Sequence, residues 1–221
     1  MVWFAVVMQV VLFQGWQVQE GSCFAVVTHK AGLASGLAHN HMVVANKYEV
    51  DVVWDAADAT SLSFTFSLDV TDLVVDEPVH QKRWQQRFWD LGLLAKDEEF
   101  SEVDKGDRKK ITEAMLSTKQ LDIAKHKKIT AEAVKVEAVN EQGLPTSLAV
   151  DIEIHGVKRQ VVVPVHVALT SDTLKAESWI PLKFTDFGIK PYSAAFGAVK
   201  NKDQFHLFVY IEAVMAGEDV P

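Results

Sequence analysis

The chain has 221 residues, of which 48% are hydrophobic, so it is long enough to bury a sizeable core in one domain. Its formal net charge is −8 and no basic stripe with interleaved aromatic residues occurs, which argues against nucleic acid as a partner. The single cysteine, Cys23, excludes an internal disulfide and any cysteine-rich zinc motif, although it does not decide the compartment.

The chain begins with a mostly apolar segment, MVWFAVVMQVVLFQG, at residues 1–15. This segment is shorter than the roughly 20 residues of a membrane-spanning helix, so no stable membrane span is expected. Its apolar run resembles the core of a signal peptide, but no Lys or Arg precedes the run and no small-residue cleavage site follows it. We therefore interpret residues 1–15 as a degraded signal peptide or, alternatively, as an apolar first strand.

Alternation of apolar and polar residues predicts half-buried β-strands, most clearly in SLSFTFSLDV at residues 61–70. Similar runs follow at 148–154, 161–167 and 205–211. In the last run Phe208 and Tyr210 make the second face apolar too, which is typical of a barrel wall with an apolar lumen and a packed exterior. Turn-forming stretches occur at 140–145, 155–159, 170–172 and 200–203, so consecutive strands are expected to be antiparallel.

Residues 78–128 interrupt this β pattern with a segment that is mainly helical. Trp84, Phe88 and Leu91 recur at helical spacing, and Asp107 is a candidate N-cap for a second helix. We expect helices near 80–92 and 107–117, packed at one mouth or flank of the sheet.

A meander of about eight strands closes most simply on itself, because closure removes exposed strand edges and leaves an interior for one apolar ligand. The sequence therefore predicts an all-β fold, an extended antiparallel β-barrel over residues 16–216 with a helical insertion at about 78–128.

Four stretches, in this order, resemble the YceI-like family of bacterial periplasmic proteins. They are SCFAVVTHKAGLASGLAHNHMV, TFSLDVTDLVVDEP, DIEIHGVKRQVVVPVHV and IPLKFTDFGIKP, and the resemblance extends from about Trp16 to Ala213. The chain departs from the family in a longer, Trp-rich insertion at 78–106 and in the histidines of LAHNH.

The resemblance implies a lipocalin-like barrel with a helix against it, binding a polyisoprenoid or a quinone-like lipid in the lumen. It also implies export, so the expected location is the periplasm. Non-catalytic carriage of a long apolar ligand is the function we expect, with no other cofactor. The sequence leaves the oligomeric state open, a homodimer included.

His39 and His41 stand one residue apart at the expected start of a strand, where they would share a face with Cα atoms about 6.6 Å apart. Both could reach one metal ion, with His126, His155, His166 or His206 as a further ligand. The alternatives are polar contacts at a pocket rim and hydrogen bonds that only hold a turn. A metal-dependent binding protein or enzyme that uses His39 and His41 is thus the rival function.

The residues offer little for catalysis. No Gly-x-Ser-x-Gly motif occurs, and carboxylates such as Asp69, Asp72 and Asp186 fit a polar strand face or a bend. We expect no catalytic residues. Large aromatic residues supply apolar surface for a lumen as well as a core, and the candidates for the lumen are Trp54, Phe64, Phe66, Trp179, Phe184 and Phe208.

Overall fold

The computed structural model describes residues 15–33, 38–96 and 98–216, so the segment interpreted as a signal peptide lies almost entirely outside the described residues. The strands are β1 (Gly15–Val18), β2 (Cys23–Ala31), β3 (His41–Ala45), β4 (Glu49–Val53), β5 (Ser63–Asp69), β6 (Leu73–Val75), β7 (Lys128–Val139), β8 (Pro145–Ile154), β9 (Val157–Pro164), β10 (His166–Leu169), β11 (Thr173–Lys183), β12 (Ser193–Ala194) and β13 (Val199–Met215). The helices are α1 (Pro78–Asp90) and α2 (Lys105–Leu116), with short 3₁₀ turns η2 (Ala59–Ser61), η3 (Val70–Asp72), η4 (Phe184–Phe187) and η5 (Ala195–Gly197).

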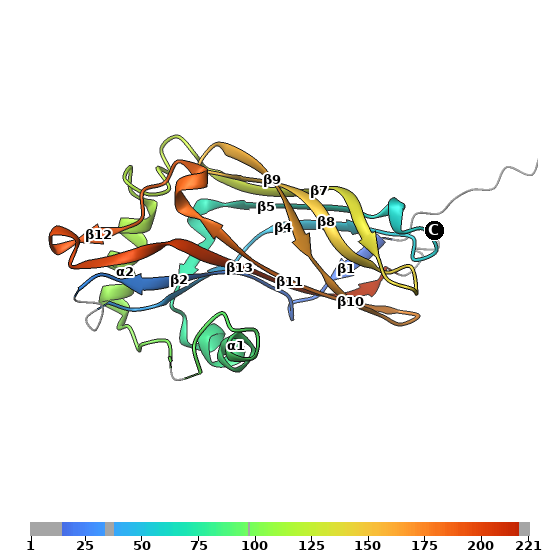
Figure 1. Ribbon diagram of the computed structural model, residues 1–221, viewed down its shortest axis with the longest axis horizontal. Helices are drawn as coiled ribbons and strands as arrows, with labels where there is room; N and C mark the ends of the chain where they lie inside the picture. Colours follow the sequence, from blue (N-terminus) through green and yellow to red (C-terminus); the bar gives the residue numbers. More distant parts are fainter. Residues whose placement is uncertain (1–14, 34–37, 97, 217–221) are drawn as a thin grey trace, which may run out of the picture.

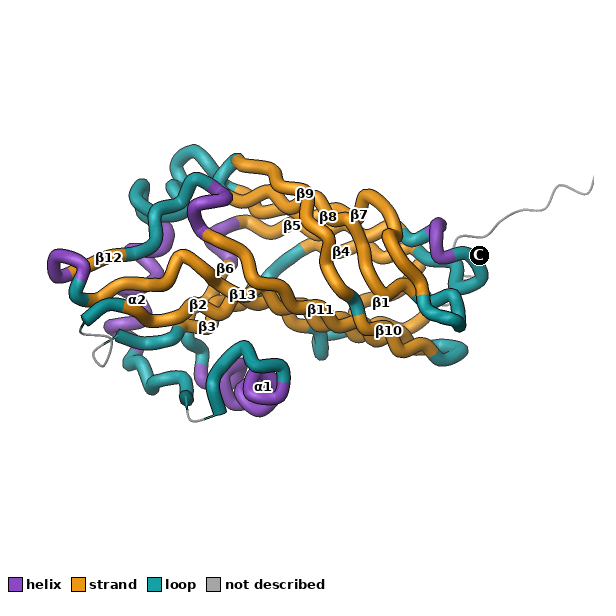
Figure 2. The backbone as a smooth tube through the Cα atoms, in the orientation of Figure 1, coloured by secondary structure: helices purple, strands orange, loops and turns teal. Residues whose placement is uncertain are grey.

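All strands belong to one antiparallel sheet, in which the long strand β13 is the centre. One edge of β13 pairs with β11, while the other edge pairs first with β2 and then, near its end, with β1. From β1 the sheet continues through β4, β5, β7 and β8 to β9, and from β2 it continues through β3 to β6. The sheet curls into an elongated shell, with β5, β7, β8 and β9 facing β2, β11 and β13 (Figures 1 and 2).

The prediction of an antiparallel β fold is confirmed, but the closed barrel is not. In the described part of the chain, β9 pairs with β8 alone and lies against β11 without forming a ladder with it. Pro164 ends β9 and Pro181 lies within β11, and neither residue has an N–H to donate to a neighbouring strand. The structure is a curled sheet with a seam between β9 and β11.

Residues 200–203, predicted as a turn, lie instead inside β13. The pairing of β13 with β2 shifts register between Asn201 and Phe205. A β-bulge inserts extra residues without ending a strand, so the polar stretch KNKD does not reverse the chain here.

Both predicted helices are present, and they cover different parts of the sheet. Helix α1 lies on the outer face of β2 and β3, whereas α2 lies across one end of the shell (Figures 1 and 2). The N-cap of α2 is Asp104 rather than the predicted Asp107, because the Asp104 carboxylate accepts the N–H groups of Gly106 and Asp107.

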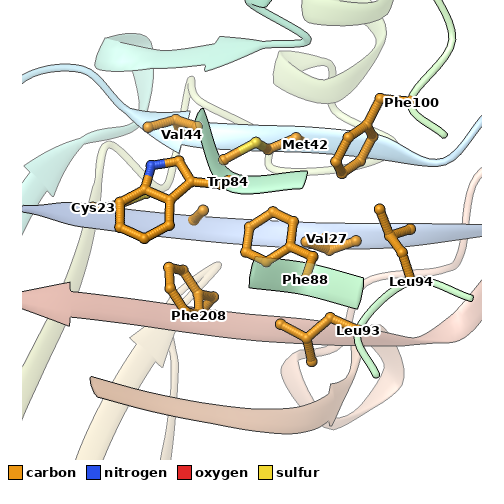
Figure 3. Close-up of a cluster of buried hydrophobic side chains, with 11 residues drawn as sticks. Cys23, Val27, Met42, Val44, Trp84, Phe88, Leu93, Leu94, Phe100 and Phe208 are labelled. Atoms are coloured by element: carbon orange, nitrogen blue, oxygen red, sulfur yellow. The ribbon is translucent and has the colours of Figure 1, made fainter. Parts of the chain in front are cut away.

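Strands under α1 are apolar on both faces, as predicted for residues 205–211. Trp84 and Phe88 of α1 pack on Phe208 with ring centroids 5.2 and 5.1 Å apart (Figure 3). Trp84 also packs against Tyr210. The remaining side chains of this outer cluster are Cys23, Ala25, Val27, Met42, Val44, Leu93, Leu94 and Phe100. Because side chains alternate along a strand, the intervening residues of β2, β3 and β13 point into the shell.

Candidate ligand-binding cavity

The interior of the shell holds a cavity of about 430 Å³. Its walls come from the inward-facing residues of the strands, such as Phe64, Phe66 and Leu68 of β5 and Leu207 and Val209 of β13. Helix α2 contributes Lys110, Ile111, Ala114 and Met115 to the lining. This volume falls in the range of small-molecule sites, and walls of this kind favour an apolar occupant.

Polar groups are few in the lining. They are Thr28, His41, Lys110, Gln120, Thr130, Glu177, Ser178, Tyr192 and Asn201. Lys110 lies on α2, the helix that covers one end of the shell (Figure 1), and its ammonium group forms an ion pair with Asp107 at 2.7 Å. A ligand with one polar group and a long apolar body would find partners for both.

His41 is held by a buried carboxylate. Its Nδ1 lies 2.6 Å from Oδ2 of Asp76, a residue that is 1% exposed. The other oxygen, Oδ1, accepts the backbone N–H of Met42 at 2.9 Å and Nε2 of Gln81 at 3.1 Å. Asp76 thereby joins β3, the end of β6 and helix α1, which gives His41 a structural hydrogen bond.

His39 differs from the expectation that it shares a strand face with His41. Strand β3 begins at His41, so His39 precedes the strand, and its exposed ring has Nδ1 2.7 Å from Oγ of Ser101. The two rings are 6.3 Å apart between centroids. Within the described residues, neither ring belongs to a group of three side chains able to share one metal ion.

The predicted lumen residues divide into two sets. Phe64, Phe66 and Phe184 line the cavity together with His41, whereas Trp54, Trp179, Phe208 and His39 do not. Phe208 lies on the outer face of β13 under α1, and Trp179 is its register partner on β11, so both point away from the cavity.

Trp54 is also a correction to the predicted lumen set. It follows the end of β4, is fully buried in the core, and its carbonyl accepts the indole N–H of Trp16 at 3.2 Å. Trp179 stacks on His166 with centroids 5.0 Å apart, which accounts for that histidine as well.

Much of the lining is aliphatic and was not singled out from the sequence. Val150 and Ile152 of β8 and Val26 of β2 face the cavity. The alternation in residues 148–154 was sufficient to identify the inward-facing residues of β8. The predicted lumen set instead favoured large aromatic residues, and it included tryptophans that belong to the core.

Cys23 does not offer a nucleophile. It is buried in the cluster under α1, and burial raises the pKa of its thiol to about 12 despite the opposing effect of Arg83. At neutral pH the side chain is a neutral apolar group.

Comparisons with known proteins identify the family of the fold. The family model described as the YceI-like domain matches residues 26–213. The structure is similar to the crystal structure of BcnA from Burkholderia cenocepacia, with a TM-score of 0.59 and 14% identity over 87% of this chain and 96% of that one. It is also similar to the YceI protein of Campylobacter jejuni, with a TM-score of 0.52 and 11% identity over 79% of this chain and 85% of that one.

No curated protein sequence matches the chain. Among the residues that the structure describes, no helix has the length and apolar character needed to cross a bilayer.

Proposed function

The chain belongs to the YceI-like family, and from this premise we propose that it binds and carries a long apolar molecule, a polyisoprenoid or a quinone-like lipid, without catalysing a reaction. The single observation that carries the proposal is the cavity of about 430 Å³ with its predominantly apolar lining.

The physical basis is the transfer of methylene groups out of water. Each methylene group buried against the cavity wall contributes about 0.8 kcal/mol. A ligand with many repeated apolar units therefore gains affinity from length alone, and it needs few directional contacts. The polar lining residues are few, so most of the wall is left apolar, as such a ligand requires.

The absence of a catalytic role is part of the proposal, and two side chains support it. Among the described residues, the His41 ring hydrogen-bonds to the Asp76 carboxylate and to no hydroxyl or thiol group, and the Cys23 thiol stays protonated. Neither group is paired with a reactive side chain in the manner of a nucleophile and its base.

A cavity-filling substitution tests the proposal. Ala131 of β7 lines the cavity, so Ala131→Leu places new bulk in the space that the ligand would occupy. Ala138→Leu makes the same change on the exposed part of the same strand and serves as the matched control. Native mass spectrometry and organic extraction of protein purified from its own host measure the lipid content of each.

We expect stoichiometric lipid in the wild type and in Ala138→Leu, and a clear loss in Ala131→Leu. Unchanged lipid content in Ala131→Leu, or no lipid in any sample together with no uptake of an added isoprenoid, would contradict the proposal. Melting temperatures of both variants separate loss of the cavity from loss of the fold.

The proposed compartment is the periplasm. It rests on the apolar run at residues 2–13, which lies outside the described residues, and on the family. Fractionation of cells that express the full chain tests this location, and protein found uncleaved and only in the cytoplasm would contradict it.

A further inference from the structure

Three side chains of the kinds that bind metal ions lie close together outside the cavity lining. Asp122 lies in the turns between α2 and β7, His126 follows it, and His155 lies in the turn between β8 and β9. One potential ligand atom from each of the three lies within 4.8 Å of the others. The two imidazole rings are 4.3 Å apart between centroids.

The carboxylate of Asp122 is buried and incompletely satisfied. The residue is 4% exposed, and its Oδ2 lies 3.0 Å from Nζ of Lys125. Within the described part of the chain, its Oδ1 has no hydrogen-bond partner. A buried carboxylate oxygen without a donor costs free energy, so this atom requires a cation or another donor.

His155 is oriented by a backbone carbonyl. Its Nδ1 lies 3.3 Å from the carbonyl oxygen of Phe187, at the end of η4. An N–H at Nδ1 donated to this carbonyl leaves Nε2 as the unprotonated nitrogen. Metal-binding histidines are commonly held in this way, with one ring nitrogen bonded to the protein and the other free for the metal.

The ring of His126 packs directly against the backbone of Gly156. A Cβ built at Gly156 would lie 2.7 Å from both Cε1 and Nδ1 of His126, so the ring occupies the space that any other residue would fill. The backbone φ of Gly156 is +69°, which also favours glycine. The hairpin turn therefore brings His126 close to His155.

From these contacts we propose that Asp122, His126 and His155 form a binding site for a divalent transition-metal ion such as Zn²⁺. Two imidazole nitrogens suit Zn²⁺ and its neighbours better than Ca²⁺ or Mg²⁺, which prefer oxygen ligands. Three protein ligands leave at least one coordination position open. Lys125, whose side chain is 74% exposed, is the counter-ion of Asp122 when no metal is bound.

The site lies at the rim of the cavity. Leu121, Ile154 and Phe187 line the cavity, and they adjoin Asp122, His155 and the carbonyl that holds His155. The metal site stands on its own contacts and is independent of the proposed apolar ligand.

Zinc titration of the full chain tests the proposal. The protein is produced without a polyhistidine tag, freed of metal with a chelator, and titrated with Zn²⁺ against a chromophoric competitor. We expect one Zn²⁺ per chain. Asp122→Asn and His155→Asn should each weaken binding by at least tenfold, because removal of even an outer partner of a metal ligand typically costs about 10- to 100-fold.

Both substitutions suit the backbone at these positions, since Asp122 and His155 have φ values of +44° and +54° and asparagine tolerates this region. Lys125→Gln removes the competing counter-ion and should leave the affinity equal or increase it. His39→Gln is the matched control outside the cluster and should bind Zn²⁺ like the wild type.

Nitrogen chemical shifts of the wild-type histidine rings give a second measurement that needs no variant. Zn²⁺ should shift the ring nitrogens of His126 and His155. Saturable binding that is lost in His39→Gln but kept in His155→Asn would overturn the proposal, as would unshifted His126 and His155 rings or no saturable binding at all.

Discussion

At the scale of single residues, Asp76 links three segments through one buried carboxylate. Its oxygens receive Nδ1 of His41, the N–H of Met42 and the amide of Gln81, and its own N–H bonds to the carbonyl of Met42 at 2.8 Å. Removal of the carboxylate leaves several buried polar groups unpaired at once, and each such group costs free energy.

We expect Asp76→Ala to lower the free energy of unfolding by about 3 kcal/mol. Asp69→Ala, at an exposed position, should change it by less than about 0.5 kcal/mol. Urea denaturation of the two variants measures both values. Equal stability of the two variants would show that the Asp76 network contributes little.

A second residue-scale feature is the histidine pair on the outer face of β2 and β13. Nε2 of His29 lies 2.7 Å from Nδ1 of His206. One of these nitrogens must accept the hydrogen bond, so at most one of the two rings can be a positively charged imidazolium. Burial lowers the pKa of His29 to about 4, with repulsion from His206 and Lys202 adding to the shift and Glu98 opposing it. Burial and Lys202 also lower the pKa of His206.

The sign of the pH dependence follows from these shifts. Because the folded pKa of His29 lies below its ordinary value of 6.5, the unfolded chain binds more protons between pH 6.5 and about 4. The stabilising effect of the neutral ring is complete above pH 6.5 and is lost as the pH falls toward 4. His29→Gln should therefore lose less stability than the wild type between pH 7 and pH 5, as measured by urea denaturation, whereas His39→Gln serves as the control.

At the scale of elements, two hairpin turns contain glycines in the left-handed region, yet they differ in surroundings. Gly143, between β7 and β8, has a φ of +78° and open space where a Cβ would lie. Gly156, between β8 and β9, has a φ of +69° and the ring of His126 in that space. A comparison of the two glycines therefore distinguishes the need for a positive φ, which both share, from the need for space in place of a Cβ, which applies to Gly156.

Alanine at Gly143 should cost only the penalty of a positive φ, about 1 kcal/mol, whereas alanine at Gly156 should cost more because the His126 ring must move as well. Thermal denaturation of Gly143→Ala and Gly156→Ala compares them. Gly156→Ala should also weaken Zn²⁺ binding, and equal stability and zinc affinity in the two variants would argue against the contact with His126.

Some helices and strands could be located from the sequence, whereas their exact ends and faces could not. Helical spacing of Trp84 and Phe88 correctly located α1, and alternation located β5, β8 and β13. The start of α2 was missed because Asp104 and Asp107 are both good N-caps, and only the backbone geometry decides between them. The alternation pattern likewise could not assign Trp179 to a face, since its face depends on the register of β11 against β13.

At the scale of the whole molecule, the shell depends on contacts between strands far apart in the sequence. Whether such a sheet closes is decided by the pairing of its last strands, which local patterns do not encode. The cluster of Asp122, His126 and His155 is of the same kind, because a turn after α2 meets a hairpin some thirty residues later. His126 and His155 were named as candidate donors, but their partnership with Asp122 required the fold.

The seam between β9 and β11 should be visible in the hydrogen exchange of the backbone amides. Strand β8 pairs with β7 on one side and β9 on the other, so the amides along β8 are expected to exchange slowly. Strand β9 pairs with β8 alone among the described strands, so only alternate amides of Val157–Pro164 should be protected and the others should exchange quickly. Residue-resolved exchange measured by NMR distinguishes the two patterns. Uniform slow exchange along β9 would mean that the seam is bridged in solution and that the sheet closes after all.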